Sequence, residues 1–404
     1  MEVSAVLKGV RVLDLSRVLA GPWATQLLGD FGADVVKVER PGSGDDTRQW
    51  GPPWLGGEQG ESAYFLSTNR NKRSVTIDLK NPQGVRIVRE MAAKADVIVE
   101  NFKPGTMQRF GLDEATLRDT NKGLIFCSIS AFGQHGNRSS EPGYDAMIQA
   151  SGGLMSITGA AETGGGEPQK VGVAIADIMA GMYAATAILA ALRHRDQSGQ
   201  GQYIDVPLYD SQVAWLANQN MNYLVGGTVP ERRGTAHPNI VPYQVFPTRD
   251  GHLMLAVGND EQFSRCVEVL ELENLAADAR FSRNAARVEN RDELVALLEA
   301  AFLRDDTNRW HEALSAVSVP CGPINDIKQV FDSEYAREQS LVRSLSHPLD
   351  EALPTVVNPI RFAATPVHYD KAPPMLGQHT DEILIEWLGY SAQAIGNLRD
   401  SGAI

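Results

Sequence analysis

Short apolar runs alternate with amphipathic stretches along the first 130 residues of the chain. The runs have the length of buried strands, and the stretches between them have helical spacing. Strands that alternate with helices favour parallel strands joined by crossover helices, so the pattern predicts a doubly wound α/β sheet. The predicted strands are 10–15, 34–39, 74–79, 96–100 and 123–130, and the predicted helices are 24–31, 83–95 and 113–120.

The pattern changes near residue 225. A linker-like stretch, 226–230, precedes two short runs, 243–247 and 252–257, which predict a hairpin about Arg249-Asp250-Gly251. Helix-like stretches follow at 260–271, 290–303 and 308–317, and the proline-rich remainder has one predicted helix at 380–388. We therefore expect a large domain over 1–224, a smaller α+β domain over 225–331, and a C-terminal segment over 332–404 that returns to the large domain.

One carboxylate, Asp177, stands directly before an uncharged stretch, 178–192, that predicts a buried helix. A carboxylate among apolar residues needs stabilisation, and the N-terminal end of a helix supplies it. The residues leave two interpretations open. Asp177 caps the helix, or it is a nucleophile in a dry cleft that can form a covalent acyl intermediate.

Composition limits the classes of partner and the cellular compartment that we expect for this chain. The chain of 404 residues has a formal net charge of −13, which argues against nucleic acid as the main partner because phosphate binding needs a basic surface. The apolar stretch 178–192 is shorter than the roughly 18 residues that a membrane span needs. Residues 1–4 show no basic region of a secretory signal. We expect a cytoplasmic protein with no membrane partner.

Residue spacing gives no support to metal or disulfide chemistry. The three cysteines are far apart and form no C-x-x-C pair, and the histidines form no H-x-x-x-H pair. The G-x-S-x-G motif of many hydrolases is missing from the sequence as well. We expect no metal site.

Polar and basic residues follow three predicted strands: Arg40, Lys80 and the pair Asn101-Phe102. Ligands of open α/β sheets bind beyond the carboxyl ends of strands, so these residues together suit an anionic ligand with a flat ring. A glycine-rich loop, 42–48, is either a ligand contact or a plain loop.

A polar loop, 234–244, contains two prolines and directly follows Arg232 and Arg233. Guanidinium groups pair well with carboxylates, so the two arginines are candidates for binding a substrate acid. An ordinary interdomain loop is the alternative.

As a set, several segments resemble the class III CoA-transferases, the family of formyl-CoA transferase and carnitine CoA-transferase. The resemblance extends over essentially the whole chain. The matching segments are 7–22, 32–41, 71–74, 99–102, 172–181, 320–324 and 376–380.

The resemblance implies that Asp177 is the catalytic residue. In this family the aspartate attacks an acyl-CoA thioester to give a mixed anhydride, and the CoA thiolate then forms an aspartyl-CoA thioester. CoA thioesters are thus substrates, and no cofactor is tightly bound. The implied fold is a large Rossmann-like domain formed by both chain ends plus a smaller domain, in an interlocked homodimer. By position, the CoA contacts fall on Leu19, Ala20, Arg40, Ile77, Lys80, Asn101, Phe102, Arg109, Tyr144 and Asp145.

The chain departs from formyl-CoA transferase at Leu19 and Pro142, where that enzyme has glutamine and lysine, and at 237–244, where it has a glycine-rich loop. Residues 234–244 and 258–263 instead resemble the branch that moves CoA from succinyl-CoA to glutarate or a related dicarboxylate. The candidate residues for the small carboxylic acid are Arg232, Arg233, His237 and Gln244.

Two alternatives to a transferase are an α-methylacyl-CoA racemase of the same fold and a non-catalytic CoA-binding protein. The racemase needs a histidine in a Gly-His-Asp motif, which here reads Gly143-Tyr144-Asp145. Tyrosine is a weak acid–base group near neutral pH. The small-residue surroundings of Asp177 argue against the non-catalytic alternative.

Overall fold

The computed structural model describes residues 5–57 and 60–404. Residues 1–4, on which the expectation about a secretory signal depends, lie outside the described residues. The chain divides into two compact units. Unit 1 comprises Met1–Gly152, Val171–Ala217 and Glu338–Ile404, and unit 2 comprises Gly153–Lys170 and Asn218–Arg337. The sequence had placed 153–170 with the large domain, whereas its contacts group it with unit 2.

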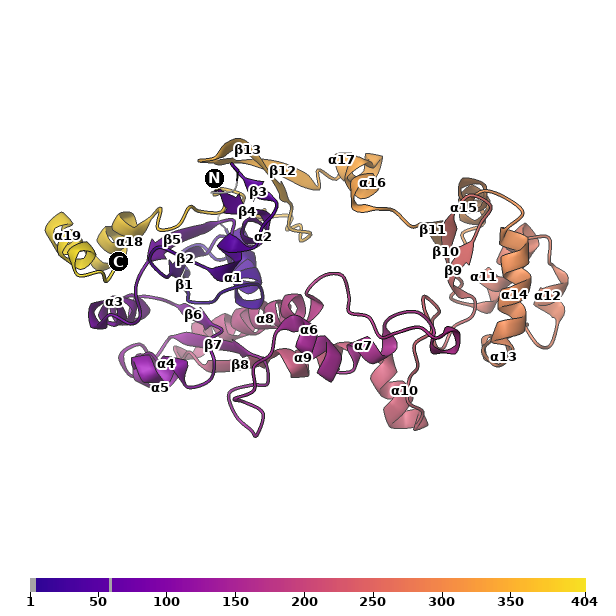
Figure 1. The fold of residues 1–404 in the computed structure, drawn as a ribbon, viewed down its shortest axis with the longest axis horizontal. Coiled ribbons are helices and arrows are strands. Elements are labelled where there is room, and N and C mark those ends of the chain that lie inside the picture. The colour runs from indigo at the N-terminus through magenta and orange to yellow at the C-terminus, as the bar shows by residue number, and fades with distance from the viewer. Residues whose placement is uncertain (1–4, 58–59) are drawn as a thin grey trace. The chain divides into compact units, whose positions relative to one another are not determined.

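Unit 1 contains a six-stranded parallel sheet in the order β5-β2-β1-β6-β7-β8 (Figure 1). The predicted α/β class with a large parallel sheet is therefore confirmed. The strand order reverses between β1 and β6, and in open α/β sheets this switch point is where ligands bind. The strands are β1 (Arg11–Asp14), β2 (Asp34–Glu39), β5 (Lys72–Thr76), β6 (Val97–Glu100), β7 (Ile125–Ser130) and β8 (Tyr203–Pro207).

Apolar clusters cover both faces of this sheet. On one face, α1 (Ala20–Asp30) and α8 (Ile175–Ser198) pack through residues such as Leu28 and Ile188, both fully buried. On the other, α3 (Pro82–Ala92) and α18 (Thr380–Leu388) contribute residues such as Trp387. Strands buried on both faces favour apolar residues, and this made most of them recognisable in the sequence, although Asp14, Lys37 and Lys72 are also fully buried in them.

Helix α8 is longer than the predicted helix at 178–192. Polar residues continue it to Ser198, so that it has 24 residues and a mean hydropathy of 1.8 over its most apolar window. By length and composition alone it is sufficient to cross a membrane, and the expectation that it is too short was wrong. Half of that window is buried within the protein, where the helix packs on β7 and β8 as a core helix does.

Gly181 allows α8 to approach α1 closely. A Cβ atom at this position would lie 2.6 Å from the carbonyl oxygen of Ala20, which is backbone and cannot rotate away. We expect Gly181→Ala to lower the free energy of unfolding by about 1–3 kcal/mol through overpacking. The matched control is Gly396→Ala in α19 (Ala392–Asp400), where the space around the Cβ is open and the same change should stabilise by up to about 1 kcal/mol. Urea denaturation of both variants should show changes of opposite sign in the free energy of unfolding. A stabilised Gly181→Ala variant would contradict the close approach of α8 to α1.

Unit 2 contains a three-stranded antiparallel sheet in the order β11-β10-β9. The predicted hairpin is present as β9 (Tyr243–Pro247) and β10 (His252–Ala256). The three predicted helices are present as α11 (Asp260–Val269), α14 (Arg291–Phe302) and α15 (Thr307–Ala316). The third strand, β11 (Cys321–Pro323), was not predicted.

The C-terminal segment holds more structure than the single helix predicted there. Residues 342–356 form a hairpin, and a further helix, α19, follows α18. The prolines misled the prediction, because Pro354 lies in a two-stranded sheet in which a missing N–H is tolerated. The remaining elements are β3 (Trp54–Leu55), β4 (Glu61–Ser62), β12 (Val342–His347), β13 (Asp350–Val356), α2 (Ala63–Leu66), α4 (Thr106–Phe110), α5 (Glu114–Thr120), α6 (Asp145–Ser151), α7 (Leu154–Ile157), α9 (Leu208–Trp215), α10 (Asn218–Gly226), α12 (Asn274–Ala277), α13 (Asn284–Glu289), α16 (Ile327–Asp332), α17 (Glu334–Glu338) and the short 3₁₀ helices Asp46–Gln49 and Glu162–Gly164.

Candidate active site

Asp177 lies in the first turn of α8 and lines a cavity of about 270 Å³. The N-cap residue of α8 is Ala174, so Asp177 is inside the helix and does not cap it. Its carboxylate has no hydrogen-bond or ion-pair partner within residues 5–57 and 60–404. The structure therefore leaves this group free to react.

The cap of α8 comes from a different carboxylate. Asp145, at the start of α6, is buried, and its Oδ1 accepts a hydrogen bond of 2.7 Å from the backbone N–H of Ala176. Its Oδ2 accepts a second bond of 2.7 Å from Nε2 of Gln149. Asp145 thus provides the helix-end stabilisation that the sequence had offered as one role for Asp177.

The surroundings of Asp177 change its acidity. Burial raises the pKa of Asp177, and the neighbouring Asp145 carboxylate raises it further, to about 7. An ionised carboxylate in this position is poorly solvated, which makes it a stronger base and nucleophile than one in water. Such a group suits covalent or acid–base chemistry near neutral pH.

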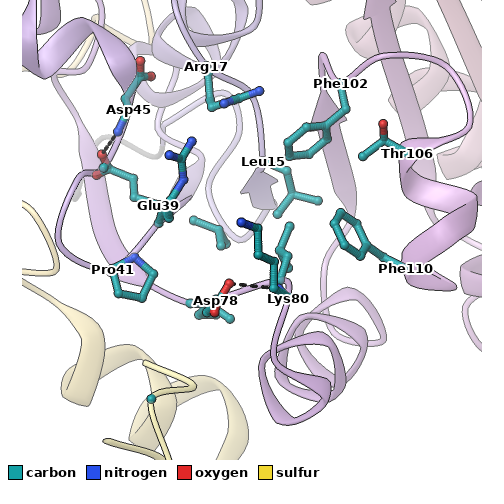
Figure 2. Close-up of a pocket in the computed structure, with 16 residues that line it drawn as sticks. Leu15, Arg17, Glu39, Pro41, Asp45, Asp78, Lys80, Phe102, Thr106 and Phe110 are labelled. Atoms are coloured by element: carbon teal, nitrogen blue, oxygen red, sulfur yellow. Dashed lines mark hydrogen bonds between the residues drawn. The ribbon is translucent and has the colours of Figure 1, made fainter.

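A second cavity of about 510 Å³ lies at the carboxyl ends of β1, β2, β5 and β6. Figure 2 shows Phe102, Thr106 and Phe110 on one side of it, Glu39 and Pro41 on the other, and Lys80 between them. Arg17 and Phe102 line this cavity and the one that contains Asp177, so the two adjoin at the switch point of the sheet. The joined space suits a long ligand with an aromatic, anionic end.

Most of the predicted CoA contacts line these cavities. Leu19, Ala20, Asn101 and Tyr144 line the smaller cavity with Asp177; Arg40, Ile77 and Lys80 line the larger one; and Phe102 lines both. Two predicted contacts line neither cavity. Arg109 is exposed on α4 and donates to Thr106 Oγ1 at 3.1 Å, and Asp145 is occupied with the cap of α8.

The side chain of Asn101 holds the backbone of Arg17. Its Oδ1 accepts a bond of 2.8 Å from the Arg17 N–H, and its Nδ2 donates one of 2.7 Å to the Arg17 carbonyl. Both ends of the amide are therefore occupied. This residue positions the loop after β1, and each end of its amide has capacity for one more hydrogen bond, so a ligand contact remains compatible with this role.

The four candidate substrate residues, two in the polar loop and two directly before it, belong to unit 2. Arg232 is largely buried and forms an ion pair of 2.9 Å with Glu162, so it holds unit 2 together. The ring of His237 contacts that of Tyr243 at a tilt of 36°, and burial together with Arg291 lowers the pKa of the His237 imidazole. Arg233 lines a separate cavity of about 420 Å³, and Gln244 lies in β9.

Sequence reasoning missed Arg17 as part of the site and left the loop that contains Asp45 and Asp46 open between a ligand contact and a plain loop. Asp45 lines the larger cavity, Asp46 lines the smaller one, and Arg17 lines both. The glycine-rich loop 42–48 was the available signal, and Gly44 also lines the larger cavity. In the part of the chain that the structure describes, no group of three or more His, Cys, Asp or Glu residues is arranged to hold a metal ion.

Comparison with known proteins gives consistent matches over nearly the whole chain. The sequence model of "CoA-transferase family III" matches residues 7–380. The chain is 46% identical over 383 residues to succinate–glutarate CoA-transferase of Agrobacterium fabrum, with 94% of this chain and 95% of that protein covered. It is 45% identical to succinyl-CoA:glutarate CoA-transferase of Mus musculus, with coverages of 98% and 90%. The crystal structure of a CaiB/BaiF family protein from Brucella suis superimposes with a TM-score of 0.83 at 43% identity, covering 95% of this chain and 99% of that one.

Proposed function

The chain belongs to CoA-transferase family III and is a CoA-transferase, and from this we propose that it moves CoA from succinyl-CoA to glutarate or a similar dicarboxylate through covalent intermediates on Asp177. The observation that carries the proposal is the carboxylate of Asp177, unpaired among the residues that the structure describes, in a cavity that continues into a larger, partly aromatic one. CoA thioesters are the substrates of this enzyme class, and the proposal requires no tightly bound cofactor.

The proposed reaction begins when the Asp177 carboxylate attacks the thioester carbonyl. The C–S bond breaks, CoA leaves as thiolate, and a mixed anhydride of Asp177 and succinate remains. The thiolate attacks the aspartyl carbonyl, which releases succinate and leaves an aspartyl-CoA thioester. The acceptor carboxylate attacks that thioester and expels the thiolate again, and the thiolate then takes the acceptor acyl group and frees Asp177.

The surroundings of Asp177 suit these intermediates. The cavity wall includes Leu19, Ala20 and Leu208, which limit the access of water that would hydrolyse an anhydride. The N-terminal end of α8 places its positive dipole at the reacting group, where negative charge develops on oxygen in each step.

The dicarboxylate class rests on the names of the relatives and on the candidate cations of unit 2. Arg232 is largely buried and paired with Glu162 at 2.9 Å, whereas Arg233 is exposed and has a longer ion pair of 3.8 Å with Glu231, so Arg233 is our candidate for the second carboxylate. We further propose an interlocked homodimer in the cytoplasm, with no membrane or nucleic-acid partner. Light scattering that gives twice the 43.9 kDa chain mass would support the dimer.

The test is to incubate the protein with succinyl-CoA and glutarate and to follow glutaryl-CoA by liquid chromatography and mass spectrometry. Hydroxylamine trapping with peptide mapping then locates the adduct. Glutaryl-CoA together with modification at Asp177 supports the proposal, and modification without glutaryl-CoA keeps the transferase mechanism but rejects this acceptor. Exchange of the α-proton of a 2-methylacyl-CoA in D₂O without CoA transfer would support the racemase instead.

The pH dependence of the reaction depends on Asp145. Since Asp177 reacts as the carboxylate and its pKa is about 7, kcat/KM for succinyl-CoA should rise with pH through neutrality. Asp145→Asn keeps an oxygen to accept the Ala176 N–H but removes the negative charge. The pKa of Asp177 should fall, so we expect the rise in kcat/KM to move to lower pH. An unchanged pH profile would show that the charge of Asp145 does not act on Asp177.

A further inference from the structure

Arg17 stands at the point where the two cavities meet and lines both of them. It follows β1 at the switch point of the sheet, and its guanidinium lies over the ring of Phe102, 5.3 Å from the ring centre. Figure 2 shows Arg17 extending toward Phe102 at the border of the larger cavity. A ligand that occupies both cavities must pass this side chain.

The backbone around Arg17 is held in a strained conformation. The next residue, Val18, has a φ of +68°, which is costly for a β-branched side chain. Both carboxylate oxygens of Asp45 accept the Val18 N–H at 3.2 Å, and Asp45 forms a fully buried ion pair of 2.8 Å with Lys37. Together with the two hydrogen bonds between Asn101 and the Arg17 backbone, these contacts fix the backbone position from which the Arg17 side chain extends.

The guanidinium itself is weakly satisfied. Its Nη1 lies 3.3 Å from Oδ2 of Asp46, and its buried Nε has no hydrogen-bond partner within the described residues. The other carboxylate oxygen of Asp46 lies 4.0 Å from Nη2 of Arg40. Two guanidinium groups thus converge on one half-exposed carboxylate through long contacts. Such a pair is suited to phosphate groups, which accept several charge-assisted hydrogen bonds at once.

We propose that Arg17 acts with Arg40 to bind the diphosphate of the acyl-CoA, and that the Asp46 carboxylate occupies this position until the substrate displaces it. The inference rests on the proposed function. With the thioester at Asp177 and the nucleotide in the larger cavity, the diphosphate falls where the cavities join. Asp46 competes with the substrate for the two arginines, so it weakens CoA binding.

The test compares Arg17→Gln, Asp46→Asn and the double variant on two donors. Succinyl-CoA carries the diphosphate, and succinyl-pantetheine lacks it. We expect Arg17→Gln to lower kcat/KM for succinyl-CoA by about 10- to 100-fold, the range for hydrogen bonds to charged groups, with little change for succinyl-pantetheine. Asp46→Asn should raise kcat/KM for succinyl-CoA by about two- to five-fold, and this gain should shrink when Arg17 is already replaced.

The matched control is Arg193→Gln, an exposed arginine near the end of α8 that lines neither cavity, and it should leave both donors unchanged. Equal losses on the two donors in Arg17→Gln would mean that Arg17 only supports the loop, and a loss in Asp46→Asn would mean that Asp46 does not compete. Either result overturns the inference.

Calorimetric titration with CoA and with pantetheine separates this inference from the proposed function. If the wild-type protein transfers no CoA but binds CoA more tightly than Arg17→Gln does, the proposed function is wrong and the diphosphate site is supported. A wild-type protein that transfers CoA while Arg17→Gln binds it equally well rejects only the inference. A folded wild-type protein that does not bind CoA rejects both.

Discussion

Replacement of Asp177 by alanine or asparagine is expected to lower kcat for CoA transfer by about 10⁴- to 10⁶-fold, the loss seen when a catalytic nucleophile is removed. Every proposed step forms or breaks a bond to this carboxylate, and an amide cannot replace it as a nucleophile. The asparagine side chain has nearly the same shape as the native one, so CoA binding should persist in Asp177→Asn. Single-turnover kinetics and calorimetric titration with CoA measure the two properties separately.

A matched control for this experiment is Asp210→Asn. Asp210 is in the first turn of α9, as Asp177 is in α8, but it is exposed and lines neither cavity. We expect this variant to retain wild-type kcat. Transfer at the wild-type rate by Asp177→Ala, or an acyl adduct trapped on another residue, would contradict the proposed mechanism.

The sequence alone could not decide whether Asp177 caps α8 or reacts. Any aspartate at a helix N-terminus is a good cap, and the pattern of apolar residues around Asp177 fits both roles. The decision depends on Asp145, which arrives from a different helix and takes the Ala176 N–H. That contact is tertiary, so local spacing does not reveal it.

The central sheet of unit 1 was predictable because most of its strands are buried on both faces. β6 and β7 contain the apolar runs Val97-Ile98-Val99 and Ile125-Phe126-Cys127, whereas in β8, at the edge of the sheet, Asp205 separates Ile204 from Val206 and Pro207 ends the strand. Edge strands need no continuous apolar run, so β8 escaped prediction. The hairpin of β12 and β13 was missed because the segment around it is rich in proline, and Pro354 lies within β13.

The site was predictable where it depends on strand ends and unpredictable where it depends on backbone geometry. Arg40, Lys80 and Phe102 follow strands, and the structure brings them to one cavity. Arg17 also comes shortly after a predicted strand, 10–15, but its position at the site depends on the left-handed Val18 and on the buried Asp45. In a sequence, neither a positive φ at valine nor a buried ion pair can be distinguished from an ordinary loop.

The second large effect is on stability, at Asp14. This residue ends β1 and is fully buried, as are Lys72 and Lys37. Its Oδ2 accepts a hydrogen bond of 3.1 Å from Nζ of Lys72 and one of 2.6 Å from Oγ1 of Thr25. Burial alone would raise the pKa of Asp14, but the two lysines and the hydroxyl hydrogen bonds outweigh it and hold the pKa below its usual value. Asp14 is therefore ionised at neutral pH. Its removal leaves Lys72 buried without its carboxylate partner.

We expect Asp14→Ala to lower the free energy of unfolding by about 3–5 kcal/mol, the cost of breaking a buried ion pair from one side. Burial has already lowered the pKa of Lys72 to about 8, and loss of Asp14 should lower it further, toward the neutral amine. Urea denaturation at neutral pH measures the change. The stability supplied by Asp14 is present above the pKa of an unfolded aspartate and is lost as the pH falls, so the gap between wild type and variant should narrow in acid.

The control replaces both members of the pair. Asp14→Leu with Lys72→Met removes the charges together and keeps the volume apolar, so this double variant should be more stable than Asp14→Ala. A double variant that is less stable than the single one would show that the lysine is satisfied by the Pro22 carbonyl and Asn69, which it also contacts at 3.0 and 2.9 Å.

The same network reaches the site, because Lys37 donates to the carbonyl of Ser16 at 2.8 Å and so supports the segment that carries Arg17. Loss of Asp14 should therefore weaken CoA binding as well as the fold.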